Sequence, residues 1–98
     1  MIRVIYRWRV ERRRQDDFIR WWHEGTVRIR SSKPGARGST LARPTAGDDD
    51  QVVAIARWDS EDDLAAFWAD PGGSDFPGAT LESVEVLHEL DHLTLEAP

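Results

Sequence analysis

The chain opens with a strict alternation of apolar and polar positions. One face of segment 2–10 would carry Ile2, Val4, Tyr6, Trp8 and Val10, and the other face holds mostly arginines. Because successive side chains of a strand point to opposite sides, this period of two predicts a strand with one strongly aromatic face.

A different period follows from about residue 14 to residue 30. Apolar and small residues recur there every three or four positions, at Phe18, Trp22, Gly25 and Ile29. Such spacing places side chains on one face of a helix. Acidic residues near its start and arginines near its end complement the helix dipole, and Pro34-Gly35 ends the segment.

Two further strands are expected at 36–43 and 51–58, separated by a polar, turn-rich segment that makes them a hairpin. Ser60 and Asp63 then resemble a capping box at the start of a second, short helix, which Pro71-Gly72-Gly73 ends. The apolar stripe of this helix holds Leu64, Phe67 and Trp68.

A fourth strand is predicted from the alternation of Val84, Val86, His88 and Leu90. Leu93 and Leu95 have the opposite parity, which indicates a bulge or bend near Asp91 and His92. The loop 71–80 before this strand is rich in glycine and proline and lies where a lid would be expected.

The order strand, helix, strand, strand, helix, strand is the split βαβ pattern. It predicts an α+β, ferredoxin-like domain with an antiparallel sheet in which the first strand lies between the third and the fourth. With 98 residues, the chain has the length of one domain, so residues 1–98 are expected to share one core.

The charges are distributed unevenly along the chain. Residues 1–43 hold 12 of the 13 basic residues and four of the 18 acidic ones, although the net charge is −5. In the predicted sheet, Arg3, Arg7 and Arg9 would face Glu85, Glu89 and Asp91 on the adjacent strand. Internal pairing therefore explains the asymmetry, and nucleic acid is not expected as a partner.

A small domain without cysteine is often stabilised by a second subunit. Two sheets packed face to face would bury a mixed apolar and ionic surface around Ile5, Val53, Ile55 and Leu87, which predicts a homodimer. The chain has no signal-peptide pattern and no apolar run of membrane-spanning length, so no membrane association and a cytoplasmic location are expected.

Four segments together resemble the antibiotic biosynthesis monooxygenase family: MIRVIYRWRV, DDFIRWW, PGARGSTLARP and VVAIARWDSEDDLAAFW. The resemblance covers about residues 1–70. It implies a dimeric α+β barrel with a pocket between the sheet and helices of each subunit. It also implies oxygenation of polycyclic aromatic or quinone-like molecules without metal or flavin, so no cofactor is expected.

The sequence departs from this family in the region after the second helix. Many relatives have a histidine there, where this chain has Asp70-Pro71-Gly72-Gly73. Haem-degrading members are identified by an asparagine in the first strand, a tryptophan in the second helix and a histidine shortly after it. In place of the asparagine, the first strand of this chain has Tyr6 or Arg7. The tryptophan is present as Trp68, but no histidine follows it before His88. Haem degradation by that mechanism is not expected, while simple haem binding stays open.

Cofactor-free oxygenation requires a substrate that can become an electron-rich anion, a base, and a dry pocket. The predicted substrate-binding residues, all with the parity or helical phase to face the sheet–helix space, are Trp8, Trp22, Phe67 and Trp68. The same aromatic residues could equally form a filled core.

Two residues are the candidates for catalysis. His88 has the parity of the aromatic face and an ordinary pKa of about 6.5, so it is the predicted base. Tyr6 could donate a hydrogen bond to a developing oxyanion. His92 is a weaker candidate, and His23 is expected at the surface. No metal site is predicted, because His88 and His92 would lie roughly 13 Å apart on an extended strand.

The leading hypothesis is thus a small homodimeric monooxygenase, or a related tailoring enzyme, acting on a hydrophobic aromatic metabolite of the polyketide type. The alternative is a dimer of the same fold that binds a small molecule or acts as an accessory protein without catalysis.

Overall fold

The computed structural model describes residues 1–93 and confirms the predicted order of elements. These elements are β1 (Ile2–Val10), a short 3-10 helix (Arg12–Arg14), α1 (Gln15–Ser32), β2 (Ala36–Ala42), β3 (Gln51–Trp58), α2 (Glu61–Ala69) and β4 (Ala79–His88). None of the helices in the described part of the chain has the length and apolar character needed to cross a membrane.

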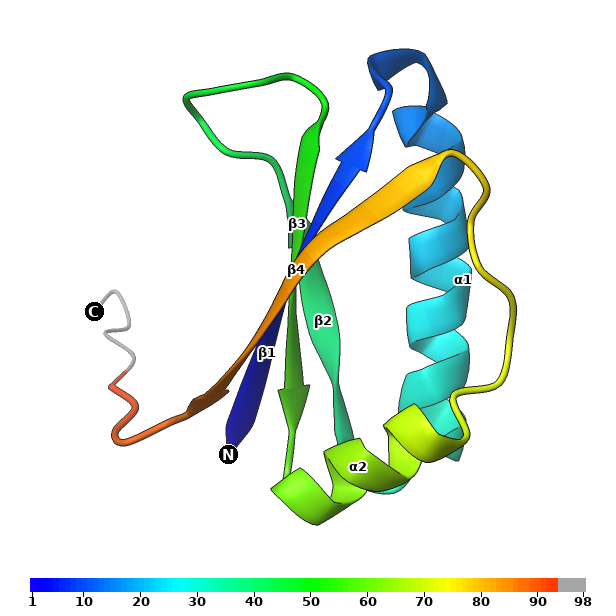
Figure 1. Ribbon diagram of the computed structural model, residues 1–98. Helices are drawn as coiled ribbons and strands as arrows, with labels where there is room; N and C mark the ends of the chain where they lie inside the picture. Colours follow the sequence, from blue (N-terminus) through cyan, green and yellow to red (C-terminus); the bar gives the residue numbers. More distant parts are fainter. Residues whose placement is uncertain (94–98) are drawn as a thin grey trace, which may run out of the picture.

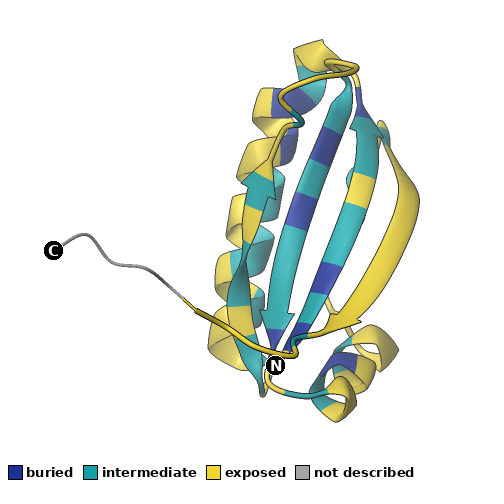
Figure 2. Ribbon diagram, turned by 90° about the vertical axis from the view of Figure 1, so that its left-hand side faces the viewer, coloured by how far each residue is buried: buried dark blue, intermediate teal, exposed yellow. Residues whose placement is uncertain are grey.

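The four strands form one antiparallel sheet in the order β2-β3-β1-β4, which confirms that β1 lies between β3 and β4. Both helices lie on the same side of this sheet (Figure 1). The other side, which we call the open face, is not covered by any element of the described chain, and β4 is exposed along nearly its whole length (Figure 2). The fold is therefore the ferredoxin-like α+β fold that the pattern predicts.

The core lies between the sheet and the helices in two clusters. One cluster contains Ile2, Val4, Trp58 and Leu64, and the other contains Val10, Phe18 and Val52. All the β1 members have even numbers, as the alternation predicts. Burial of each such aliphatic or aromatic side chain stabilises the fold by about 1.5–3 kcal/mol.

Helix α2 begins at the predicted cap. The Ser60 hydroxyl accepts a hydrogen bond from the Asp63 N–H at 3.1 Å and donates one to the Asp63 carboxylate at 2.9 Å. In a full capping box, the acidic side chain would instead accept from the backbone N–H of the cap residue. The cap is confirmed, but its return hydrogen bond runs between the two side chains.

The irregularity in β4 lies elsewhere than the sequence predicted. The strand ends at His88, before Asp91 and His92, so a strand bulge there is wrong for the described residues; Leu95 lies outside them. Instead, Arg7 pairs with Ser83 and Trp8 with Leu81, which leaves Glu82 as the extra residue of a bulge. The bulge keeps Leu81 and Val84 on the helix-covered side even though their parities differ.

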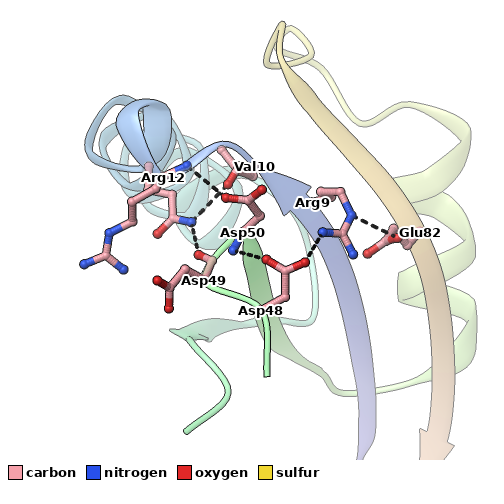
Figure 3. Close-up of polar contacts among 8 residues, drawn as sticks. Arg9, Val10, Arg12, Asp48, Asp49, Asp50 and Glu82 are labelled. Carbon is pink, nitrogen blue, oxygen red and sulfur yellow. Dashed lines mark hydrogen bonds and ion pairs between the residues drawn. The ribbon is translucent and has the colours of Figure 1, made fainter. Parts of the chain in front are cut away.

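The predicted pairing of charges across β1 and β4 is confirmed for two of three arginines. Arg3 lies 3.2 Å from Glu89 and Arg7 lies 3.9 Å from Glu85. Arg9 is not paired with Asp91. It lies instead between Asp48 of the hairpin, at 2.6 Å, and the bulge residue Glu82, at 3.5 Å (Figure 3).

Candidate functional site

A cavity of about 870 Å³ lies between the sheet and its helical cover. The sheet side of the cavity is formed by residues of β1, β2 and β3, with Ala79, Leu81 and Val84 of β4. One wall is α1, another is the end of α2, and the segment 71–76 closes the remaining side. A cavity of this size lies within the range that holds drug-sized ligands.

Small residues create the space. Gly25 on α1 and Ala54 and Ala56 on β3 all line the cavity. A Cβ added at Gly25 would meet only the tip of Arg28, at 3.8 Å. At Gly25 the helix therefore leaves open volume where a larger residue would fill the gap.

Aromatic side chains form much of the rest of the lining. All four predicted substrate-binding residues are present in it, as Trp8, Trp22, Phe67 and Trp68. Tyr6 and Trp8 stack with their ring centroids 5.5 Å apart and their planes at 14°, which presents a continuous aromatic surface from β1. Such a surface suits the flat face of a planar ring system.

Tyr6 supplies the polar group of this aromatic surface. Its hydroxyl accepts a hydrogen bond from the Trp68 indole N–H at 3.1 Å. Burial raises the pKa of Tyr6 above its ordinary value of 10.0, against the smaller opposing effect of the Trp68 hydrogen bond. Tyr6 therefore keeps its proton at neutral pH, and because its oxygen accepts from Trp68, its own O–H can donate to a ligand.

The segment 70–78 runs along α1, as Figure 1 shows. The Trp21 indole N–H donates to the Ser74 carbonyl at 3.0 Å, and Lys33 donates to the Asp70 carbonyl at 2.7 Å. Phe76 packs against Phe18 with centroids 5.4 Å apart. This segment forms the outer wall of the cavity, and its action as a lid stays a prediction.

The sequence indicated a lid at this segment, but it did not indicate the roles of Phe76 and Trp21 in the cavity wall. Trp21 lines the cavity beside Trp22, and Phe76 closes it from the loop. The neighbouring tryptophans were a usable signal, since two large side chains about 100° apart widen a helical face. Nothing in the glycine-rich loop indicated that Phe76 would fold back onto α1.

The predicted base, His88, lies apart from these residues. It pairs with Ile2 at the end of β4, its side chain is exposed, and its ring contacts the carboxylate of Glu61 on α2. It is not among the cavity-lining residues. His92 lies beside Glu89, 3.2 Å away, and His23 is exposed as expected. The structure therefore brings Tyr6 together with the predicted aromatic residues but does not bring a histidine to them.

The sequence of the chain matches one family. The family model for antibiotic biosynthesis monooxygenase matches residues 1–72. The chain belongs to the antibiotic biosynthesis monooxygenase family. The matched range ends within the cavity wall, so it includes β1, both helices and the hairpin, whereas β4 lies beyond it. No curated protein sequence matches the chain closely enough to count as a relative.

Three solved structures show the same fold at low sequence identity. The haem-degrader MhuD from Mycobacterium tuberculosis, with two haems bound in its active site, is 18% identical with a TM-score of 0.78, covering 96% of this chain and 100% of MhuD. A mutant form of SnoaB, a cofactor-independent oxygenase from Streptomyces nogalater, is 20% identical with a TM-score of 0.68, covering 94% and 95%. Rv0793 from Mycobacterium tuberculosis is 19% identical with a TM-score of 0.61, covering 95% and 98%.

The two named activities, haem degradation and cofactor-independent oxygenation, place different demands on a pocket. Haem iron is normally held by histidine, cysteine, methionine or tyrosinate. Among residues 1–93, the cavity lining contains no histidine, cysteine or methionine, and the raised pKa of Tyr6 disfavours a tyrosinate. The lining fits the flat body of an aromatic molecule better than it fits coordination of an iron atom.

Proposed function

We propose that the protein is a monooxygenase that acts on a planar aromatic metabolite bound in the sheet–helix cavity, without a metal or flavin. The observation that carries this proposal is the aromatic cavity of about 870 Å³ in which the Tyr6 hydroxyl is held by Trp68 on the aromatic surface. Membership of the monooxygenase family supports it.

The proposed reaction converts an activated methylene, flanked by aromatic rings and a carbonyl or phenol, into a carbonyl. Loss of a C–H proton gives a carbanion whose charge is delocalised onto the oxygen. The carbanion reduces O₂ and, after protonation, forms a C–OOH group. Loss of water then breaks the O–O bond and leaves C=O, so one oxygen atom enters the product and the other leaves as water. No external reductant is needed.

Tyr6 is the group placed to assist the first step. A hydrogen bond from its O–H would stabilise negative charge on the substrate oxygen, and the surrounding aromatic rings would strengthen that bond by excluding water. The described lining contains one carboxylate, Asp75, and we propose that it accepts the proton. The base role predicted for His88 is less well supported, because its side chain contacts Glu61 outside the cavity.

The test is oxygen uptake with anthrone-type substrates, with ¹⁸O₂ used to follow one labelled atom into the product. Tyr6→Phe keeps the ring and removes the donor, so we expect kcat to fall about 100-fold, as for the loss of one oxyanion donor. His88→Ala is the matched comparison and is expected to change kcat by less than about twofold, because its side chain lies outside the cavity. A large loss in His88→Ala with an active Tyr6→Phe would reverse these assignments.

The second candidate is a binding protein of the same fold without catalysis. It is favoured by the absence of a histidine from the described lining. Saturable binding of an anthrone with no oxygen uptake above the uncatalysed rate would establish this function and exclude the oxygenase.

We also propose that the active form is a homodimer joined through the open face. Ile5, Val53 and Ile55 lie at the centre of that face with the partly exposed Leu87. The ion pairs Arg3–Glu89 and Arg7–Glu85 flank them. A second sheet would cover these apolar side chains and leave the charged groups paired.

A further inference from the structure

Most arginines of the described chain are paired, and two of the unpaired ones line the cavity. Six arginines form ion pairs in residues 1–93: Arg3, Arg7, Arg9, Arg13, Arg20 and Arg37. Arg14 lies over the Phe76 ring and Arg43 donates to Gln15. By contrast, Arg28 and Arg30 both line the cavity, and neither guanidinium has a hydrogen bond or ion pair within the described chain.

The two guanidinium groups lie on different sides of the cavity. Arg28 points toward the loop, where a Cβ at Gly72 would lie 3.2 Å from its Nη1 and a Cβ at Gly73 would overlap it. The absence of side chains on these two glycines allows the guanidinium to rest directly on the wall formed by 71–76. The Arg30 side chain passes Gly38 on β2, with its Cδ 4.0 Å from the position of an added Cβ.

Arg57 also lines the cavity, and its Nε is buried without a hydrogen-bond partner in the described chain, but its odd position in β3 places it with the open face. It is directly opposite Arg3 in the β1–β3 register, and its charge contributes to lowering the pKa of Glu89, just after β4. We therefore count it with the ionic groups of the open face. Apart from Arg57, the charged residues that line the cavity are Arg28, Arg30 and Asp75.

This local excess of positive charge stands against the net charge of −5 for the whole chain. An acidic protein with 18 carboxylates could have paired these arginines internally, as it does for most of the others. We propose that the cavity is selective for aromatic molecules that carry a carboxylate group, with Arg28 as the principal anchor and Arg30 as a second cation. A guanidinium can hold a carboxylate through two parallel hydrogen bonds, which fixes the orientation of the ring system as well.

This inference rests on the proposed function, because it assumes that the cavity binds an aromatic ring system. It adds a second requirement for binding, a carboxylate group on the aromatic ligand. The rings would stack on the surface of Tyr6 and Trp8, while the carboxylate would lie at the α1 wall, so the two ends of the ligand are recognised by different chemistry.

The experiment compares two ligands of the same shape, anthraquinone-2-carboxylate and anthraquinone-2-carboxamide, by isothermal titration calorimetry on the full chain. Wild-type protein is expected to bind the carboxylate about tenfold more tightly than the amide, in line with a charge-assisted pair. Arg28→Gln should remove most of this preference and leave the Kd of the amide within about twofold, because the amide carries no charge to pair. Arg12→Gln is the matched control, since Arg12 is an exposed arginine of the 3-10 helix that does not line the cavity.

Each outcome decides between the two claims. Equal affinity of wild-type protein for both ligands, or an unchanged preference in the Arg28→Gln, Arg30→Gln double variant, overturns the carboxylate selectivity while leaving aromatic binding established. Failure of both ligands to bind overturns the proposed function and this inference together. Thermal unfolding of each variant, expected to match wild type because both arginines are exposed, separates lost binding from lost structure.

Discussion

Gly25 is the residue whose presence is hardest to explain without the cavity. It lies inside the 18-residue helix α1, where glycine is less favourable than alanine by about 0.5–1 kcal/mol. Its backbone is helical, so no turn requires it, and an added Cβ would enter open space. The cost in helix stability is therefore associated with open volume in the cavity that Gly25 lines.

Gly25→Ala is accordingly expected to raise the free energy of unfolding by about 0.5–1 kcal/mol, measured by urea denaturation. Gly35→Ala is the matched control, because Gly35 has φ of +79° and a Cβ there would overlap Asp63, so that variant should lose stability. A destabilised Gly25→Ala would show that the space at this helix position is occupied.

Sequence alone placed Tyr6 on the correct face of β1, because parity fixes direction in a strand. It could not show that the Tyr6 hydroxyl meets the indole of Trp68, 62 positions later, since that contact depends on how α2 docks on the sheet. For His88 the predicted face of the strand was correct. Its position along the strand, which parity does not give, keeps it out of the cavity. The residue lies at the end of β4 beside Ile2, beyond the cavity.

At the scale of elements, β4 shows that the alternation of apolar and polar residues does not by itself locate a bulge or the start of a strand. The spacing of three between Leu81 and Val84 was the available sign of a bulge, but the sequence prediction placed the irregularity near Asp91. The strand starts at Ala79, earlier than its regular alternation suggested, because alternation is interrupted at Glu82. Strands β2 and β3 and both helices were predicted almost to the residue, since each has clear caps, turns or periodicity.

The cap of α2 gives a prediction at this scale. Ser60→Ala removes the acceptor for the Asp63 N–H and should lower the free energy of unfolding by about 1 kcal/mol. Ser32→Ala, which removes a hydroxyl bonded back to the Arg28 carbonyl in the last turn of α1, is expected to change it by less than half of that. Equal effects in chemical denaturation would mean that the cap does not hold α2 in place.

For the whole molecule, the proposed homodimer joins through the open face. Ile55→Asp places an unpaired carboxylate at its centre, and we expect this variant to be monomeric at concentrations where wild type is dimeric, as measured by sedimentation velocity. Val27→Asp is the control, because Val27 is an exposed apolar residue of α1, on the opposite side of the sheet. A monomeric wild-type protein, or a dimeric Ile55→Asp variant, would contradict assembly through this face.

Binding of a planar aromatic molecule in the sheet–helix cavity is the property from which the proposed function follows. The most direct measurement is a titration with anthraquinone-2-carboxylate and an anthrone, following the fluorescence of the five tryptophans. Wild-type protein is expected to show saturable quenching at one ligand per chain, and Gly25→Leu, whose side chain would extend into the cavity, is expected to lose it. No saturable response in wild type, or the same binding in a folded Gly25→Leu variant, would contradict binding in this cavity.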